Sequence, residues 1–156
     1  SNNLMELVST NVDLLAIAET KLDPSFPINQ FTFPGFKKPY RFDVNAKQCG
    51  IMVLVNSNIP SRLINLSYCP NDIQQISIEL NFNKHKWLIV SIYKPPTQNE
   101  HYFLEKLTIL LYHYDKDYEN ILIIGDFNLE PDLEPVREFM LNHNLDNLIK
   151  NPTCFK

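Results

Sequence analysis

Hydrophobic residues along the chain occur in short runs separated by segments rich in proline, aspartate and asparagine. Uninterrupted apolar runs bounded by turn residues are typical of strands that are covered on both faces. The segment 73–80 instead alternates, with Ile76, Ile78 and Leu80 on one face. The predicted strands are residues 12–19, 50–56, 61–66, 73–80, 86–93 and 119–128.

Three other segments have a helical period. Apolar residues at i, i+4, i+7 and i+11 predict a helix within 100–116 that has one core face. Its core residues are Phe103, Leu107, Leu110 and Tyr114. Residues 132–144 predict a second helix, with Asp132 as N-cap and Pro135 in its first turn. Residues 2–9 predict a third helix. Many strands and few helices indicate two packed sheets with helices outside.

Residues 20–43, between the first two predicted strands, contain four prolines and six aromatic residues. This composition predicts a long, rigid loop rather than a disordered linker. Two interpretations stay open for its aromatic residues, which either anchor the loop to the core or stack on nucleobases. These residues are Phe26, Phe31, Phe33 and Phe36. The basic residues Lys37, Lys38, Arg41 and Lys47 either belong to a solvated loop or contact phosphates. Trp87 is expected in the core.

The composition narrows the class of protein. A chain of 156 residues with 44% hydrophobic content is expected to form one globular domain. No apolar run is long enough for a membrane span, and the first residues do not form a signal-peptide pattern. The three cysteines, Cys49, Cys69 and Cys154, are odd in number and lack CxxC spacing. This pattern favours free thiols in a reducing compartment over a disulfide framework or a zinc site.

The net charge of −4 argues against a simple nucleic-acid-binding module, which usually carries a basic surface. It does not exclude an enzyme that meets phosphate through a bound cation, because the cation then supplies the local positive charge.

Polar residues follow three of the predicted buried strands. Glu19 follows LLAIA, Tyr93 follows WLIVSI, and Asp126 and Asn128 follow ILIIG. The apolar run before Asp126 predicts a central strand, and ligands often bind beyond the carboxyl ends of such strands. If the strands are parallel neighbours, these side chains form one oxygen-rich site that suits Mg²⁺. The alternative is that they are solvated strand ends and turn or capping residues.

Five segments, LLAIAETKLD, GIMVLVN, LIVSIYKPP, ILIIGDFNLEP and NPTCF, occur in the order seen in the endonuclease/exonuclease/phosphatase superfamily. The chain most resembles the apurinic-endonuclease-like endonuclease domain of non-LTR retrotransposons. The resemblance implies an α/β fold, a four-layer sandwich of two mixed β-sheets flanked by helices. Residues 1–156 would form a single domain of this kind, truncated at both termini.

The same resemblance implies a role for each matching residue. Glu19 corresponds to the metal-binding glutamate, with Mg²⁺ as the expected ion and Mn²⁺ as a substitute. Asp126 corresponds to the aspartate that orients or deprotonates the attacking water. Asn128 supports that aspartate and contacts phosphate, and Tyr93 hydrogen-bonds the phosphate. Thr153 corresponds to a threonine that contacts DNA near the cleavage site.

The chain also departs from the family pattern. A strand bearing a supporting asparagine would precede Ser1, and an aspartate and an Asp-His pair would follow Lys156. The four histidines, expected at the surface, are His85, His101, His113 and His143. The usual glycine doublet is Cys49-Gly50, and Val44 replaces an expected arginine, whereas Arg41 is retained as a substrate-binding candidate. Residues 1–156 alone are therefore expected to be inactive.

The expected function is that of a metal-dependent phosphodiesterase, a retrotransposon endonuclease that nicks DNA to prime reverse transcription. The expected partners are DNA and a reverse transcriptase domain in the parent polypeptide, with no membrane. The expected location is intracellular, in the nucleus for the parent element. Two alternatives remain: another superfamily phosphoesterase acting on phosphomonoesters, phosphoinositides or sphingomyelin, and a non-catalytic remnant that binds partners.

Overall fold

The computed structural model describes residues 11–45, 48–65 and 72–150, and the fold is given for these residues. The strands are β1 (Leu14–Ala18), β2 (Tyr40–Asn45), β3 (Gln48–Val55), β4 (Ser61–Ile64), β5 (Gln74–Phe82), β6 (His85–Tyr93) and β7 (Asn120–Asp126). The helices are the 3₁₀ helix η1 (Ile28–Phe31), α2 (Glu100–Tyr114) and α3 (Glu134–Asn142). No helix in these ranges has the length and apolar character needed to cross a membrane.

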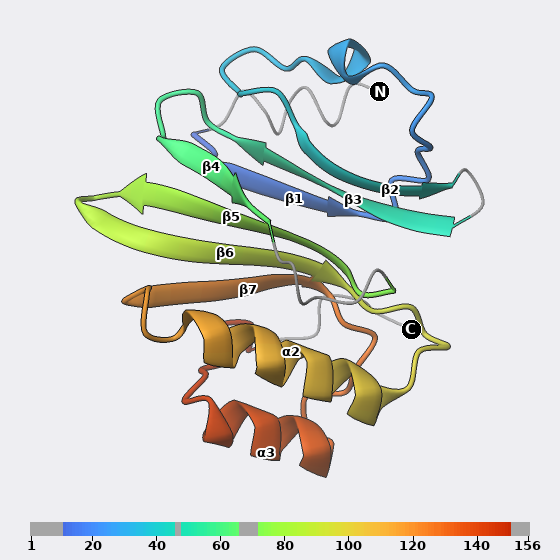
Figure 1. The fold of residues 1–156 in the computed structure, drawn as a ribbon, viewed down its shortest axis with the longest axis vertical. Coiled ribbons are helices and arrows are strands. Elements are labelled where there is room, and N and C mark those ends of the chain that lie inside the picture. The colour runs from blue at the N-terminus through green and yellow to red at the C-terminus, as the bar shows by residue number, and fades with distance from the viewer. Residues whose placement is uncertain (1–10, 46–47, 66–71, 151–156) are drawn as a thin grey trace.

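The strands form two sheets that pack face to face (Figure 1). One sheet has the order β1-β3-β2 and is antiparallel. The other has the order β4-β5-β6-β7, in which only the β6–β7 pair is parallel. Helices α2 and α3 cover the outer face of the four-stranded sheet, and the chain between β1 and β2 lies over the three-stranded sheet. The predicted α/β sandwich of two sheets is confirmed.

Strand β7 is packed on both faces, as its uninterrupted apolar run predicts. Ile121 and Ile123 contact the core beneath the helices, whereas Leu122 and Ile124 contact the core between the sheets. Its predicted central position is not what the described residues show, because there β7 pairs only with β6 and ends the sheet. Coverage of both faces by other layers is sufficient to explain the pattern.

The predicted face of α2 is confirmed. Phe103, Leu107, Leu110 and Tyr114 are all buried and pack with β6 residues in the core beneath the helices. Segment 73–80 also behaves as predicted, since its alternating apolar residues are buried between the sheets. Trp87 is half-buried against the same inter-sheet core rather than fully inside it.

Two local predictions are wrong. Residues 40–45 form strand β2, although the sequence places them at the end of a loop, because pairing with β3 supplies their backbone hydrogen bonds. Only Tyr40 and Phe42 reach the inter-sheet core, so the apolar signal is weak. Asp132 is not the N-cap of α3. Leu133 occupies that position without a side-chain capping bond, and Pro135 lies in the first turn as predicted.

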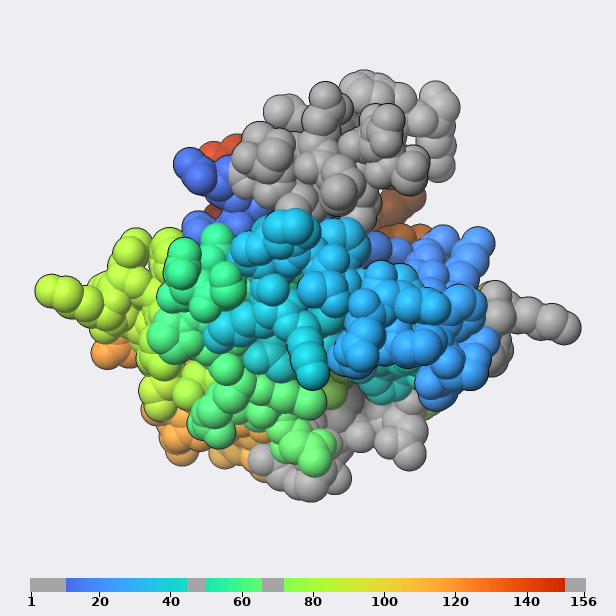
Figure 2. All heavy atoms as spheres, turned by 90° about the horizontal axis from the view of Figure 1, so that it is seen from above, coloured from blue at the N-terminus to red at the C-terminus, as the bar shows by residue number. Residues whose placement is uncertain are grey.

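The chain from residue 20 to residue 39 is an anchored loop, as predicted. Its blue and cyan atoms form much of the face seen from above in Figure 2. It covers outward-facing residues of β3, since Met52 and Leu54 are buried at 3% and 0% exposure. Phe31, Phe33 and Phe36 are half-buried in the loop, whereas Phe26 is exposed. The predicted helix at residues 2–9 lies outside the described residues.

Candidate active site

The ends of β6 and β7 bring Tyr93 and Asp126 side by side. The two residues are partners in the parallel ladder, and the Lys94 N–H donates to the Asp126 carbonyl at 2.9 Å. In β7, Leu122 and Ile124 face the inter-sheet core, so alternation directs Asp126 to the same side. Tyr93 also faces that core and is 1% exposed, whereas Asp126 lies at the surface.

Glu19 reaches this point from the other sheet. The Tyr93 hydroxyl donates to Glu19 Oε1 at 3.2 Å, although the two residues are 74 positions apart. Three of the predicted residues are therefore brought together. They meet across the gap between two sheets rather than along one sheet edge, because β1 belongs to the three-stranded sheet.

The backbone at Glu19 is in the left-handed region, with φ of 55°, and Lys21 has φ of 52°. In β1, Ala16 and Ala18 face the inter-sheet core, so regular alternation would direct Glu19 away from it. The left-handed residue ends this alternation and allows the carboxylate to meet Tyr93. Such conformations are uncommon outside glycine and asparagine, and they concentrate at functional sites.

The close approach of β6 explains why a glycine, Gly125, precedes Asp126. Its φ is 145°, and a Cβ atom there would lie 1.8 Å from the Ile92 carbonyl oxygen on β6. Only glycine permits this approach of the two strands. The turn that follows fixes Asn128, which has φ of 44°. Its N–H donates to Asp126 Oδ1 at 3.1 Å, and its Nδ2 donates to the Lys94 carbonyl at 2.8 Å. The turn interpretation of Gly-Asp-Phe-Asn is therefore confirmed, whereas its role in a site stays a prediction.

Lys94 is a residue that the sequence interpretation missed. It is 1% exposed, and its ammonium donates to the Pro95 carbonyl at 3.3 Å. Within the described ranges it forms no ion pair with a carboxylate. Its backbone bonds to Asp126 and Asn128 hold the two site strands in register. A lysine placed directly between a buried strand and Pro95 was the available signal.

The hydrogen bonds of Arg41 go to residues outside this set. Its guanidinium pairs with Asp43, and it donates to the carbonyls of Phe26 at 2.9 Å and Asp23 at 3.3 Å. The side chain is 8% exposed, so the observed contacts fix the loop. Substrate binding by Arg41 stays a prediction. Thr153 and Lys47 lie outside the described residues. Lys37 donates to Ser61, which lies at the end of the four-stranded sheet that is far from Tyr93.

The donor chemistry of the site fits a hard cation. Glu19 and Asp126 present exposed carboxylates, and Asn128 offers an amide oxygen. Among the described residues, no three His, Cys, Asp or Glu side chains are arranged to hold a metal ion. Mg²⁺ is often bound by one or two carboxylates together with waters and substrate phosphate, so a smaller set of protein ligands is sufficient.

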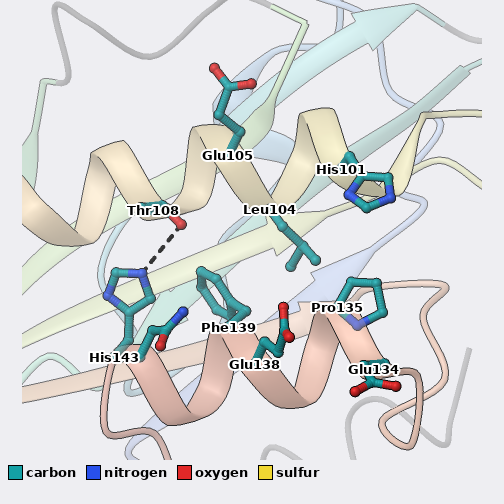
Figure 3. A pocket seen from close by; sticks show the side chains of 10 residues that line it. His101, Leu104, Glu105, Thr108, Glu134, Pro135, Glu138, Phe139 and His143 are labelled. Carbon is teal, nitrogen blue, oxygen red and sulfur yellow. Dashed lines mark hydrogen bonds between the residues drawn. The ribbon is translucent and has the colours of Figure 1, made fainter.

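A separate groove of about 540 Å³ lies between α2 and α3 (Figure 3). His143 accepts or donates a hydrogen bond with Thr108 at 3.2 Å there, and His101 lines the other end. His85 and His113 are exposed, as predicted, whereas His143 is half-buried. None of the strand-end residues lines this groove.

Carboxylates, a phenol and an amide thus lie at the strand ends of a two-sheet α/β sandwich. The sequence profile of the Endonuclease/Exonuclease/phosphatase family matches residues 1–154. The chain belongs to this family. Its members are nucleases and phosphatases, hydrolases that generally use divalent metals. No curated protein matches the chain.

Solved structures share the fold. Humanized D. rerio TDP2, which carries 14 mutations, aligns with a TM-score of 0.61 and 13% identity over 94% of this chain. The human Nocturnin catalytic domain with bound sulfate aligns with a TM-score of 0.60 and 18% identity over 90% of this chain. The 3′-5′ exonuclease NExo of Neisseria meningitidis aligns with a TM-score of 0.58 and 18% identity over 83% of this chain. The chain spans 63%, 60% and 53% of these three structures, respectively.

Proposed function

We propose that the protein is a metal-dependent phosphodiesterase, the endonuclease of a non-LTR retrotransposon, which nicks target DNA and leaves a 3′ hydroxyl to prime reverse transcription. The observation that carries the proposal is the contact between Tyr93 and Glu19 at 3.2 Å, with Asp126 paired to Tyr93 in the ladder. It unites residues from three strand ends. Glu19 and the neighbouring residue Asn128 have left-handed backbones, a conformation that concentrates at functional sites.

Each residue has a distinct role in this proposal. Asp126 positions the attacking water and accepts its proton, since its carboxylate is exposed at the strand end. The Asn128 amide, fixed by its bond to the Lys94 carbonyl, orients the phosphate beside Asp126. Tyr93, which donates to Glu19, would hydrogen-bond a phosphate oxygen when substrate binds. Glu19 would hold Mg²⁺, which when bound polarises a phosphoryl oxygen and stabilises a leaving oxygen.

DNA is the proposed substrate because the Glu-Thr, Gly-Asp-Phe-Asn and NPTCF motifs together resemble the retrotransposon enzymes. The proposal includes a reverse transcriptase domain in the same polypeptide, Thr153 and Arg41 as DNA contacts, and a nuclear location. A phosphomonoesterase of the same family would use a similar strand-end site, so the test must separate the two substrates.

Replacement of Asp126 tests the proposal. We expect Asp126→Asn to reduce Mg²⁺-dependent nicking of supercoiled plasmid by the full-length protein about 10²–10⁴-fold, the usual contribution of a positioned acid or base. Asp132→Asn is the matched control, because Asp132 is exposed in the same connection and does not cap α3. Wild-type release of phosphate from p-nitrophenyl phosphate without nicking would indicate a phosphomonoesterase instead. More than about a tenth of wild-type nicking in Asp126→Asn would exclude the assigned role.

A further inference from the structure

The anchored loop carries an exposed apolar segment, residues 24–28, here named the loop ridge. Phe26 is 41% exposed and Ile28 is 39% exposed, and Pro24 and Pro27 are exposed beside them. The other three phenylalanines of the loop are half-buried. Phe26 therefore does not serve the anchoring role that the loop aromatics share.

The loop ridge is held in this exposed position by hydrogen bonds. Arg41 donates to the Phe26 carbonyl at 2.9 Å and pairs with Asp43, and its guanidinium lies 5.1 Å from the centre of the Phe31 ring. The Phe26 N–H closes a turn onto the Asp23 carbonyl at 3.1 Å. The backbone on which Phe26 stands is thus fixed before any ligand binds, and this lowers the entropic cost of binding.

The loop ridge is continuous with the active site. The loop begins directly after Glu19, and Lys21 is exposed between Glu19 and the ridge. A chain of seven residues spans at most about 25 Å, which is about seven nucleotides of a stacked strand at about 3.4 Å each. A strand whose phosphate lies at Glu19 can therefore extend to Phe26, whereas a small phosphoester cannot.

We propose that the loop ridge is a nucleobase-stacking site, in which Phe26 stacks on an unstacked base of the strand bound at the active site and Lys21 contacts an intervening phosphate. The inference rests on the proposed DNA substrate and adds the means of holding it. Proteins that bind single-stranded nucleic acid combine exposed aromatic rings with basic residues along the path of the backbone, and here Lys21 is exposed in the segment between Glu19 and Phe26. The ridge would hold the strand that flanks the cleaved phosphate.

The test uses purified protein and a short single-stranded DNA that contains 2-aminopurine, without divalent metal so that no cleavage occurs. Stacking on Phe26 should quench the probe, and Phe26→Ala should remove the quenching and weaken binding about 5- to 150-fold. Phe26→Trp should restore both. Tyr112→Ala is the matched control, because Tyr112 is an aromatic residue 68% exposed on α2, and it should behave like wild type.

Equal binding and quenching by Phe26→Ala and wild type would overturn the inference, and so would the absence of any quenching in wild type. Phe26-dependent binding to anionic phospholipid vesicles, with none to DNA, would overturn it in favour of a membrane contact. The assay involves no hydrolysis, so it fails independently of the proposed function. A protein that stacks but does not nick contradicts only the endonuclease assignment, and one that nicks without Phe26-dependent quenching contradicts only the stacking site.

Discussion

Substitution of Gly125 by alanine tests the link between the β6–β7 approach and the active site. The added Cβ would lie 1.8 Å from the Ile92 carbonyl oxygen, whereas real Cβ contacts are at least 3.0 Å. The strands would have to separate by the difference between these values, about 1.2 Å. Such a movement strains the hydrogen bonds of the ladder next to the Tyr93–Asp126 pair.

The cost has two parts. A side chain at φ of 145° adopts a conformation that is essentially restricted to glycine, which costs about 1–3 kcal/mol. Gly125 itself is exposed, but relief of the clash with the Ile92 backbone costs about 1–3 kcal/mol more, the usual cost of overpacking. The free energy of unfolding should therefore fall by about 2–6 kcal/mol, a large fraction of the roughly 5–15 kcal/mol typical of a domain.

Urea unfolding followed by circular dichroism measures this change, and Gly35→Ala is the matched control. Gly35 also has a positive φ, of 83°, but a Cβ there meets nothing within 4 Å. It should show only the conformational part, about 1–3 kcal/mol. Equal destabilisation by the two substitutions would refute the steric argument, and unchanged nicking in Gly125→Ala would refute the coupling to Asp126.

Three further predictions concern strain and pH. Glu19→Gly should change the free energy of unfolding by less than about 1 kcal/mol, because the relief of strain at φ of 55° offsets the loss of the hydrogen bond from Tyr93. It should also raise the Mg²⁺ concentration needed for nicking, and a loss of stability well above about 1 kcal/mol would contradict the offset. Burial and the hydrogen bond to Glu79 raise the pKa of Tyr118 above the usual 10.0. The contribution of Tyr118 to the free energy of unfolding is complete below pH 10.0 and is lost as the pH rises through the folded-state pKa. The stability advantage of wild type over Tyr118→Phe, measured by urea unfolding, should therefore shrink above pH 10.0. Hydrogen bonds from Arg62 and Tyr118 lower the pKa of Glu79 below the usual 4.5. The stability advantage of wild type over Glu79→Gln should therefore shrink as the pH falls below 4.5.

Much of the fold follows from local patterns in the sequence. The unbroken apolar run of β7 predicted packing on both faces, and the helical period of α2 predicted its buried side. These predictions succeeded because the repeat of a regular backbone alone decides which side chains share a face. Strand β2 was missed for the same reason. Its apolar residues Tyr40, Phe42 and Val44 form an alternation too short to separate it from the preceding loop, and pairing with β3 completes the strand.

The site was predictable only as a set of residue types at strand ends. Asp126 and Tyr93 could be expected to meet if their strands were parallel neighbours, and they are. The contact from Glu19 to Tyr93 depends on how the two sheets pack and on a left-handed residue that no sequence pattern indicated. The burial of Lys94 likewise depends on tertiary structure. The sequence by itself determined which residues could do the chemistry. Their meeting was decided by tertiary structure, because contacts between distant segments depend on the packing of whole layers.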